Sequence, residues 1–253
     1  MANEHRLGSL SSALLATAHN EWVAGPLLGG PAAQGTSVPV RNPSDHRDIV
    51  GYVQEACLDD VNTAIESSFI TGPLWQATPP SERASILDRA ADQMESEIQP
   101  LMGLLVREAG KTFSNAIAEV REAVDFLRYY AAQARQDLTN DTHRPLGPVV
   151  CISPWNFPLA IFTGQVAAAL AAGNSVLAKP AEQTPLVAAQ AVRILLGAGV
   201  PEGVLQLIPG HGETVGAGLV GDERVKGVMF TGSTEVARLL QRNVAGRLDS
   251  QGR

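Results

Sequence analysis

The sequence predicts an α/β protein in which a parallel sheet carries helices on both faces, preceded by a helical segment. From about residue 145, four short apolar runs alternate with stretches of helical composition. The apolar runs show little polar alternation, which is typical of strands buried on both faces. We divide the chain into an N-terminal helix and loop segment (1–40), a hairpin with helices (41–144), and strand–helix units (145–253).

The composition favours a folded core and argues against several classes of protein. The 253 residues are 45% hydrophobic and 18% charged, which is typical of a globular chain. The formal net charge is −7 without a basic run, so a nucleic-acid partner is disfavoured. Two cysteines, Cys57 and Cys151, cannot build a disulfide framework or a zinc cage, and we expect no metal site. A reducing, cytoplasmic setting fits them best.

The N-terminal segment is predicted to contain one short helix followed by a loop. Residues 7–18 favour a helix, and residues 19–40 are rich in glycine and proline, which is typical of turns. The apolar stretch from Leu10 to Ala18 ends in small residues, as signal-peptidase sites do. A signal peptide begins with a positively charged region, and the acidic Glu4 argues against one here, so secretion is disfavoured. Phe157 to Gly173 is alanine-rich and contains polar residues, so we expect a buried helix there and no membrane span.

The second segment is predicted to begin with a hairpin and to continue as helices. Val38 to Val53 reads as two strands joined by the turn Asn42-Pro43-Ser44-Asp45, where proline fixes φ and the polar side chains accept local backbone bonds. Asp59-Asp60 and Pro79-Pro80 favour helix starts. Gly110 favours a helix end, because glycine adopts the left-handed conformation of a C-cap.

The clearest helix is predicted over residues 112–136. Its apolar residues recur at steps of three and four, which indicates one buried stripe. The stripe consists of Phe113, Ile117, Val120, Val124, Leu127, Ala131 and Ala134. Four charged residues fall largely outside it: Glu119, Glu122, Asp125 and Arg128.

The third segment is predicted to contain four strand–helix units. The expected strands are 148–153, 175–178, 204–208 and 225–230, and the expected helices are 158–172, 183–198, 213–220 and 234–244. In such sheets ligands bind beyond the carboxyl ends of the strands. We therefore expect one crevice lined by the loops 153–157, 179–182, 209–213 and 231–234.

Two of these loops carry side chains suited to catalysis and ribose binding. Asn156 lies between two prolines, and a rigidly held carboxamide can donate to a developing oxyanion, although a helix cap is the alternative. Lys179 and Glu182 can hold ribose hydroxyls from two sides, and an acidic residue there favours NAD over NADP. The alternative for this pair is an exposed ion pair of little energetic value.

The other two loops carry weaker signals for phosphate binding. The glycine-rich stretch from Pro209 to Gly216 permits close approach of a ligand, but its spacing departs from G-x-G-x-x-G. No acidic partner of His211 is identifiable, so an exposed loop histidine is favoured. Thr231 to Thr234 offers amides and hydroxyls at a helix start, which suits a pyrophosphate or an ordinary N-cap.

Taken together, the loops resemble the aldehyde dehydrogenase superfamily. The matching motifs are Pro154-Trp155-Asn156-Phe157-Pro158, Lys179-Pro180-Ala181-Glu182-Gln183-Thr184-Pro185, Gly199-Val200-Pro201-Glu202-Gly203-Val204 and Phe230-Thr231-Gly232-Ser233-Thr234-Glu235. The upstream stretches 107–112 and 119–130 resemble one branch in particular. That branch is the L-glutamate γ-semialdehyde (pyrroline-5-carboxylate) dehydrogenase module of bacterial proline utilization A proteins, and the resemblance covers essentially the whole chain.

The resemblance implies a Rossmann-like NAD-binding domain and a role for several residues. The implied cofactor contacts are Trp155 with the phosphates, Lys179 and Glu182 with the adenosine ribose, Gly212 and Val236 with the adenine, and Ser233 with the pyrophosphate. Asn156 is implied as the donor to the thiohemiacetal oxyanion, and Glu122 and Phe157 as neighbours of the aldehyde. A surface ion pair for Glu122 and core packing for Phe157 are the alternatives.

The family's thiolate nucleophile and its glutamate base lie in Gly-Gln-x-Cys and Glu-x-Gly-Gly patterns, which this sequence lacks. Cys151 lies in an apolar run, where an inert buried thiol is expected. We therefore expect a truncated, NAD-binding portion without the catalytic domain, inactive alone and with uncovered apolar helix faces. The resemblance implies a full-length protein that oxidises L-glutamate γ-semialdehyde and carries a proline dehydrogenase domain in the same polypeptide.

Other functions stay open from the sequence. A non-catalytic fragment could bind NAD or a partner chain, and the family resemblance also allows a different aldehyde substrate. An unrelated α/β dehydrogenase is disfavoured by the irregular glycine loop and by the four motifs. DNA binding, which some proline utilization A proteins perform through a separate domain, is disfavoured by the net charge of −7.

Overall fold

The computed structural model describes residues 4–17 and 20–247. The elements of the first half are α1 (Glu4–Thr17), β1 (Trp22–Ala24), β2 (Ser37–Asn42), β3 (Asp45–Gln54), α2 (Leu58–Ala77), α3 (Pro80–Ser96), α4 (Ile98–Ala109) and α5 (Phe113–Asp137). The second half contains β4 (Val149–Ile152), α6 (Ala160–Ala171), β5 (Val176–Lys179), α7 (Pro185–Gly197), β6 (Leu205–Leu207), the π-helical turn η1 (Gly212–Gly216), α8 (Ala217–Gly221), β7 (Gly227–Phe230) and α9 (Thr234–Ala245).

A small three-stranded sheet in the order β1-β3-β2 forms from the first segments. The hairpin prediction is confirmed, because β2 and β3 pair antiparallel. The loop expected over residues 19–40 is wrong at Trp22 to Ala24, which pair in parallel with Gly51 to Val53 of β3. Three residues are too few to show strand periodicity, and their partner lies far along the chain, so no local pattern marks this strand.

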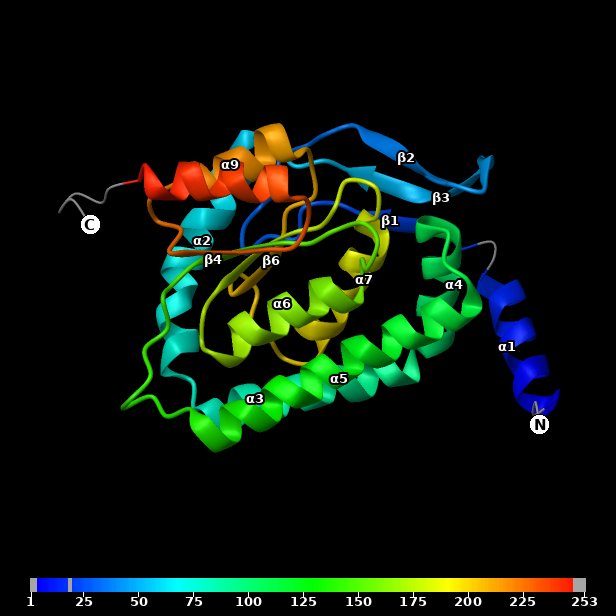
Figure 1. Ribbon diagram of the computed structural model, residues 1–253, viewed down its shortest axis with the longest axis horizontal. Coiled ribbons are helices and arrows are strands. Elements are labelled where there is room, and N and C mark those ends of the chain that lie inside the picture. The colour runs from blue at the N-terminus through cyan, green and yellow to red at the C-terminus, as the bar shows by residue number, and fades with distance from the viewer. Residues whose placement is uncertain (1–3, 18–19, 248–253) are drawn as a thin grey trace.

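The main sheet has the strand order β6-β5-β4-β7, and all its pairs are parallel. Successive residues point to opposite faces and enter two separate apolar clusters. Cys151 and Ala178 belong to the larger cluster, which includes residues of α6 and α7. Val150 and Leu177 belong to the smaller one, together with Ile65 of α2. The α/β fold class is therefore confirmed, with helices covering both faces of the sheet (Figure 1).

The long helix α5 lies alongside α3 and also contacts α6 (Figure 1). Its apolar stripe is confirmed from Val120 onward, but Phe113 and Ile117 are exposed. The placement of Glu119 outside the buried face is wrong, since this side chain is buried. Ala116, one position before Ile117, faces the core, and Glu119 follows it at a step of three on the same face.

The predicted helix ends are set by identifiable groups. Gly110 ends α4 with φ of 64°, which confirms the predicted left-handed C-cap. The carboxylate of Asp60 accepts the backbone N–H of Cys57 at the start of α2. No helix among residues 4–17 and 20–247 is long and apolar enough to cross a membrane.

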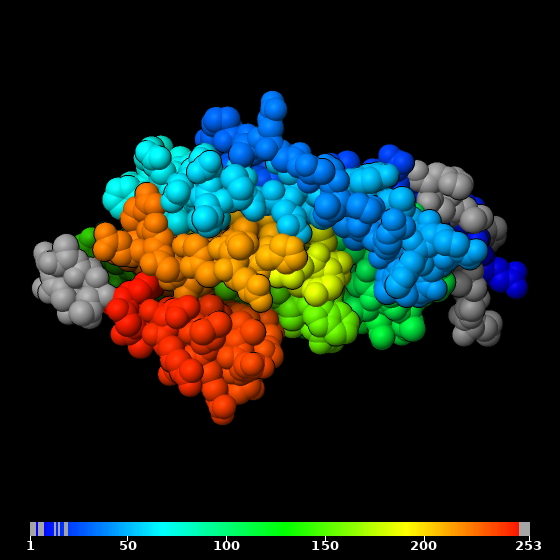
Figure 2. Space-filling view, turned by 90° about the horizontal axis from the view of Figure 1, so that it is seen from above, coloured from blue at the N-terminus to red at the C-terminus, as the bar shows by residue number. Residues whose placement is uncertain are grey.

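Among the strands of the main sheet and the helices that follow them, β7 and α9 are the least buried. All four residues of β7 are half-buried, and α9 buries no residue. Val236, Leu239 and Val244 on this helix are exposed. In Figure 2 the segment that contains α9, coloured red, projects from the body of the molecule. An apolar helix face is therefore uncovered here, as the sequence predicts.

Candidate functional site

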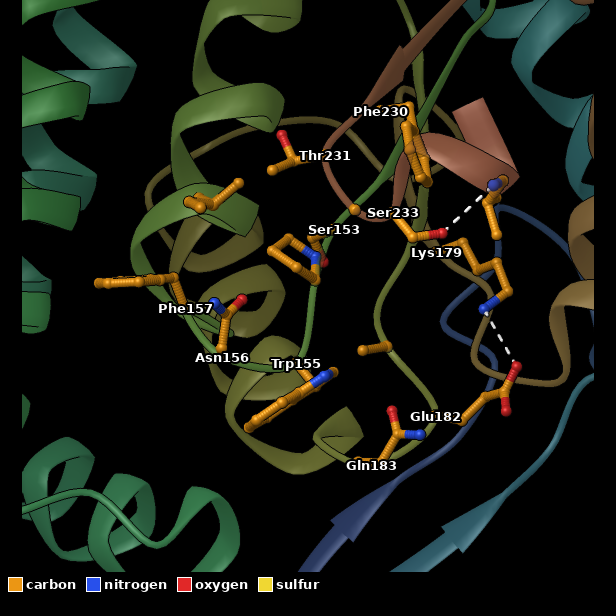
Figure 3. Close-up of a pocket in the computed structure, with 15 residues that line it drawn as sticks. Ser153, Trp155, Asn156, Phe157, Lys179, Glu182, Gln183, Phe230, Thr231 and Ser233 are labelled. Carbon is orange, nitrogen blue, oxygen red and sulfur yellow. Dashed lines mark hydrogen bonds and ion pairs between the residues drawn. The ribbon is translucent and has the colours of Figure 1, made fainter. Parts of the chain in front are cut away.

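A cleft of about 660 Å³ lies at the carboxyl ends of β4, β5 and β7 (Figure 3). Its lining comes from three of the four expected loops, with residues 153–157, 179, 181–183 and 230–233, and from Ile161 of α6 and Val236 at the start of α9. The fourth loop, 209–213, does not line the cleft, which corrects the expectation of one shared crevice. It lies behind Glu182 and contacts that side chain instead.

The loop after β4 carries three exposed residues in sequence, Trp155, Asn156 and Phe157. The indole of Trp155 is 58% exposed, so its face is available to a ligand. Figure 3 shows Trp155, Asn156 and Phe157 extending from this one loop. Because Pro154 and Pro158 flank the three residues, the backbone between them is restricted.

Gln165 of α6 joins the loops after β4 and β7, a role that was not predicted from the sequence. Its Nε2 donates to the carbonyl of Ile152 at 3.2 Å and to the hydroxyl of Thr231 at 3.0 Å. Ile152 ends β4 and Thr231 directly follows β7, so one buried amide links the two strand ends. A polar residue in an apolar helix is the available signal, but its partners are not readable from sequence.

Lys179 ends β5 and is buried, so the exposed ion pair considered as an alternative is wrong for this residue. Its Nζ donates to the carbonyl of Pro180 at 3.2 Å and lies 3.9 Å from Oε1 of Glu182. Burial lowers the pKa of Lys179, while the nearby carboxylates of Glu182 and Glu55 raise it in part. An ammonium has three N–H donors, so donors remain for a ligand hydroxyl.

Glu182 is fixed by the loop 209–213. Its Oε1 accepts the backbone N–H of Gly212 at 2.7 Å, and its Oε2 lies 3.3 Å from Nδ1 of His211. His211 Nε2 lies 3.4 Å from Glu55, so this histidine has two acidic neighbours that the sequence did not reveal. Each oxygen of a carboxylate can accept two hydrogen bonds, so Glu182 keeps acceptor capacity toward the cleft.

The third wall of the cleft is the start of α9. The hydroxyl of Ser233 accepts the N–H of Val236 at 3.2 Å, as an N-cap does. The positive end of the helix dipole therefore faces the cleft beside a hydroxyl group (Figure 3). Val236 is 42% exposed on the same wall.

Three further residues lie outside the cleft lining. Glu122 is exposed on α5 and does not line it. Cys151 is buried in β4, and burial raises the pKa of its thiol to about 12, so it is not a thiolate near neutral pH. The exposed Cys57 lies at the start of α2, on a different element from the cleft.

A comparison with family profiles matches residues 31–251 to the aldehyde dehydrogenase family. The bifunctional protein PutA of Escherichia coli (strain K12) is 72% identical over 253 residues, which are 100% of this chain and 19% of that protein. The same-named protein of Rhizobium meliloti is 54% identical and is covered over 20% of its length. The chain therefore spans about a fifth of these relatives.

Solved structures agree with the sequence comparison. Proline utilization A from Bdellovibrio bacteriovorus superposes with a TM-score of 0.92 at 30% identity, covering 100% of this chain and 28% of that one. A 1-pyrroline-5-carboxylate dehydrogenase from Thermus with bound NAD gives a TM-score of 0.89 at 34% identity, covering 98% of this chain and 51% of that one. The family match, the relatives and the fold together place this chain in the aldehyde dehydrogenase family.

Proposed function

We propose that this chain supplies the NAD-binding region of an enzyme that oxidises L-glutamate γ-semialdehyde to L-glutamate in proline catabolism. The observation that carries the proposal is the Glu182 carboxylate, which the Gly212 amide holds beside the buried ammonium of Lys179. This pair combines two acceptor oxygens with free N–H donors, which is what a ribose diol requires. The 72% identity to a bifunctional PutA supports the choice of substrate.

The size and the chemistry of the cleft support NAD as its ligand. Its volume of about 660 Å³ lies in the range of ligand sites. The start of α9 with Ser233 would bind the pyrophosphate, because backbone N–H groups and the helix dipole favour anions. We propose that Trp155 lies beside the phosphates and Val236 beside the adenine. Gly212, which lies outside the cleft lining and donates to Glu182, would contact the adenine from the adjoining loop. When bound, NAD would supply the acceptor for the substrate hydride.

The chemistry of the aldehyde would take place beside Asn156. Its carboxamide would donate to the oxyanion formed when a thiolate attacks the aldehyde. Phe157 would pack against the substrate chain. Glu122 lies on α5 outside the cleft lining, so its place beside the substrate rests on the family resemblance alone. The thiolate and the general base are not among the residues of this chain, since neither motif occurs in the sequence. We propose that the chain alone binds NAD without turnover, and that a proline dehydrogenase domain belongs to the whole protein.

The choice among aldehydes is the finest part of the proposal. A Bacillus subtilis relative named alpha-ketoglutaric semialdehyde dehydrogenase is 36% identical to this chain. A 1-pyrroline-5-carboxylate dehydrogenase of Anoxybacillus flavithermus is 42% identical. Both names describe five-carbon substrates that bear a carboxylate, and the higher identity to the PutA proteins favours the glutamate semialdehyde.

Calorimetric titration of the 253-residue chain with NAD tests the proposal. We expect saturable binding that Glu182→Gln weakens at least tenfold, because one acceptor oxygen of the ribose site is replaced by a donor. Glu21→Gln is the matched control, since Glu21 is an exposed glutamate outside the cleft lining. Absence of NAD binding, or equal binding by all three proteins, would contradict the proposal.

A further inference from the structure

An ion pair between a half-buried lysine and a buried glutamate contacts the loop that carries Asn156. Lys111 follows the end of α4, and Glu119 lies on α5. Lys111 Nζ and Glu119 Oε2 are 3.0 Å apart, and their side chains are 13% and 1% exposed. We propose that this pair positions the loop 155–159, and with it the Asn156 carboxamide and the Phe157 ring, for the aldehyde substrate.

Glu119 holds the far end of the loop. Its Oε1 accepts the backbone N–H of Leu159 at 2.8 Å and that of Ala160 at 3.4 Å. These groups begin α6 and would otherwise lack partners within the helix. The carboxylate therefore acts as an N-cap supplied from another helix, and it fixes the position at which the loop enters α6.

Lys111 holds the middle of the loop. Its Nζ donates to the backbone carbonyl of Asn156 and lies 4.3 Å from the centre of the Phe157 ring. An ammonium above an aromatic face is attracted by the ring electrons, and the attraction grows when water is excluded. One side chain thus contacts both residues that the proposed function places at the substrate, while its charge is balanced by Glu119.

A second capping glutamate shows that a cation is not required for capping alone. Glu108 of α4 accepts the N–H groups of Leu186 at 2.6 Å and Val187 at 2.9 Å, at the start of α7. Within residues 4–17 and 20–247, no ion pair is formed by Glu108. The cation beside Glu119 therefore has an additional role, and its contacts with Asn156 and Phe157 identify that role.

The consequence for catalysis rests on the proposed function, whereas the restraint of the loop does not. An oxyanion donor must be held within about 0.5 Å of its productive position. A displacement of about 1 Å can cost on the order of a hundredfold in rate. Lys111 fixes the backbone of Asn156 without occupying its carboxamide, so the side chain remains available to donate.

Amide hydrogen exchange of the 253-residue chain tests this inference, with Lys111→Met as the main variant. The readout is the exchange rate of residues 155–160 divided by that of residues 185–190. We expect the ratio to rise at least tenfold in Lys111→Met and to return toward the parent value in Lys111→Arg, which keeps the cation. Glu108→Gln is the matched control and should lower the ratio, because it loosens α7 instead.

An unchanged ratio in Lys111→Met would overturn the inference, because it would assign the pair to general stability alone. If that variant does not fold, the double variant Lys111→Met/Glu119→Gln leaves no buried charge unpaired and gives the same comparison. The test needs no NAD. A raised ratio in a chain that fails to bind NAD would therefore refute the proposed function and leave the restraint of the loop intact.

Discussion

Each side of the cleft rests on a buried glutamate that caps the helix after its loop. Glu119 caps α6 behind the loop with Asn156, and Glu108 caps α7 behind the loop with Lys179 and Glu182. Glu119 is paired with Lys111, whereas burial raises the pKa of Glu108 to about 8 against two backbone hydrogen bonds that lower it. The same type of cap is thus held as an ion pair on one side and is open to protonation on the other.

This difference between the two caps matches the different functions that we propose for the two sides of the cleft. The Asn156 side would handle a reacting aldehyde, where exact placement affects the rate. The Lys179 side would bind a ribose, where several hydrogen bonds share the task and each tolerates small displacements. The Lys111–Glu119 pair contacts its loop at the Asn156 carbonyl, the Phe157 ring and the Leu159 N–H. Glu108 contacts only the start of α7.

The largest expected effect is on the Asn156 side. Lys111→Met leaves the Glu119 carboxylate buried without its partner, so we expect the free energy of unfolding to fall by roughly 3 kcal/mol. Glu108→Gln removes no ion pair and should cost less, on the order of 1–2 kcal/mol for one mismatched amide. Urea unfolding measures both values. An equal loss in the two variants would remove the distinction between the two sides.

The next effect is a pH dependence of stability on the Lys179 side, which comes from Glu108. The folded pKa of Glu108 is about 8 and its ordinary value is 4.5, so between these values the folded chain holds a proton that the unfolded chain has lost. The free energy of unfolding from this group therefore falls as pH rises from 4.5 to about 8, by at most about 1.4 kcal/mol per unit. Urea unfolding across this range should show the slope, and Glu108→Gln should lack it.

The matched control for this pH series is Glu119→Gln, which leaves Glu108 unchanged. We expect it to retain the same contribution from Glu108. A constant difference between the parent and Glu108→Gln throughout pH 5 to 8 would show that Glu108 does not titrate there.

The smallest expected effect concerns the exposed third wall. Ser233→Ala removes the hydroxyl that accepts the Val236 N–H, at a cost of about 1 kcal/mol to α9. Because α9 buries no residue, we expect faster amide exchange in residues 235–240 and an unchanged urea midpoint for the whole chain. Ser233→Asn should preserve the cap. Faster exchange in the Asn156 loop and in the loop with Lys179 and Glu182 as well would show that the three walls of the cleft are structurally coupled.

Much of the fold could be predicted from local patterns. The four parallel strands were predictable because runs of buried β-forming residues alternate with helical stretches. The end of α4 was predictable because a C-cap in the left-handed conformation favours glycine, here Gly110. Strand β1 could not be predicted in this way, because the strand with which it pairs lies about thirty residues further along the chain. The start of α5 was misjudged because Phe113 and Ile117 are large and apolar yet face outward.

The site was predictable where the motif itself carries the chemistry. Lys179 and Glu182 lie at one edge of the cleft because Lys179 ends β5 and Glu182 follows it by three residues. The roles of Lys111 and Glu119 were hidden, since their partners lie about 40 residues away on another element. The burial of Glu119 is consistent with its position in the sequence, because it lies three residues after Ala116 and therefore on the same helix face.

The central claim is that both sides of the cleft form one NAD site. An amide-exchange map of the 253-residue chain, with and without saturating NAD, tests it most directly. We expect slower exchange in residues 153–160, 179–186 and 231–237 together, with α3 unchanged as an internal reference. Protection confined to one of these loops, or found only outside the cleft, would contradict it.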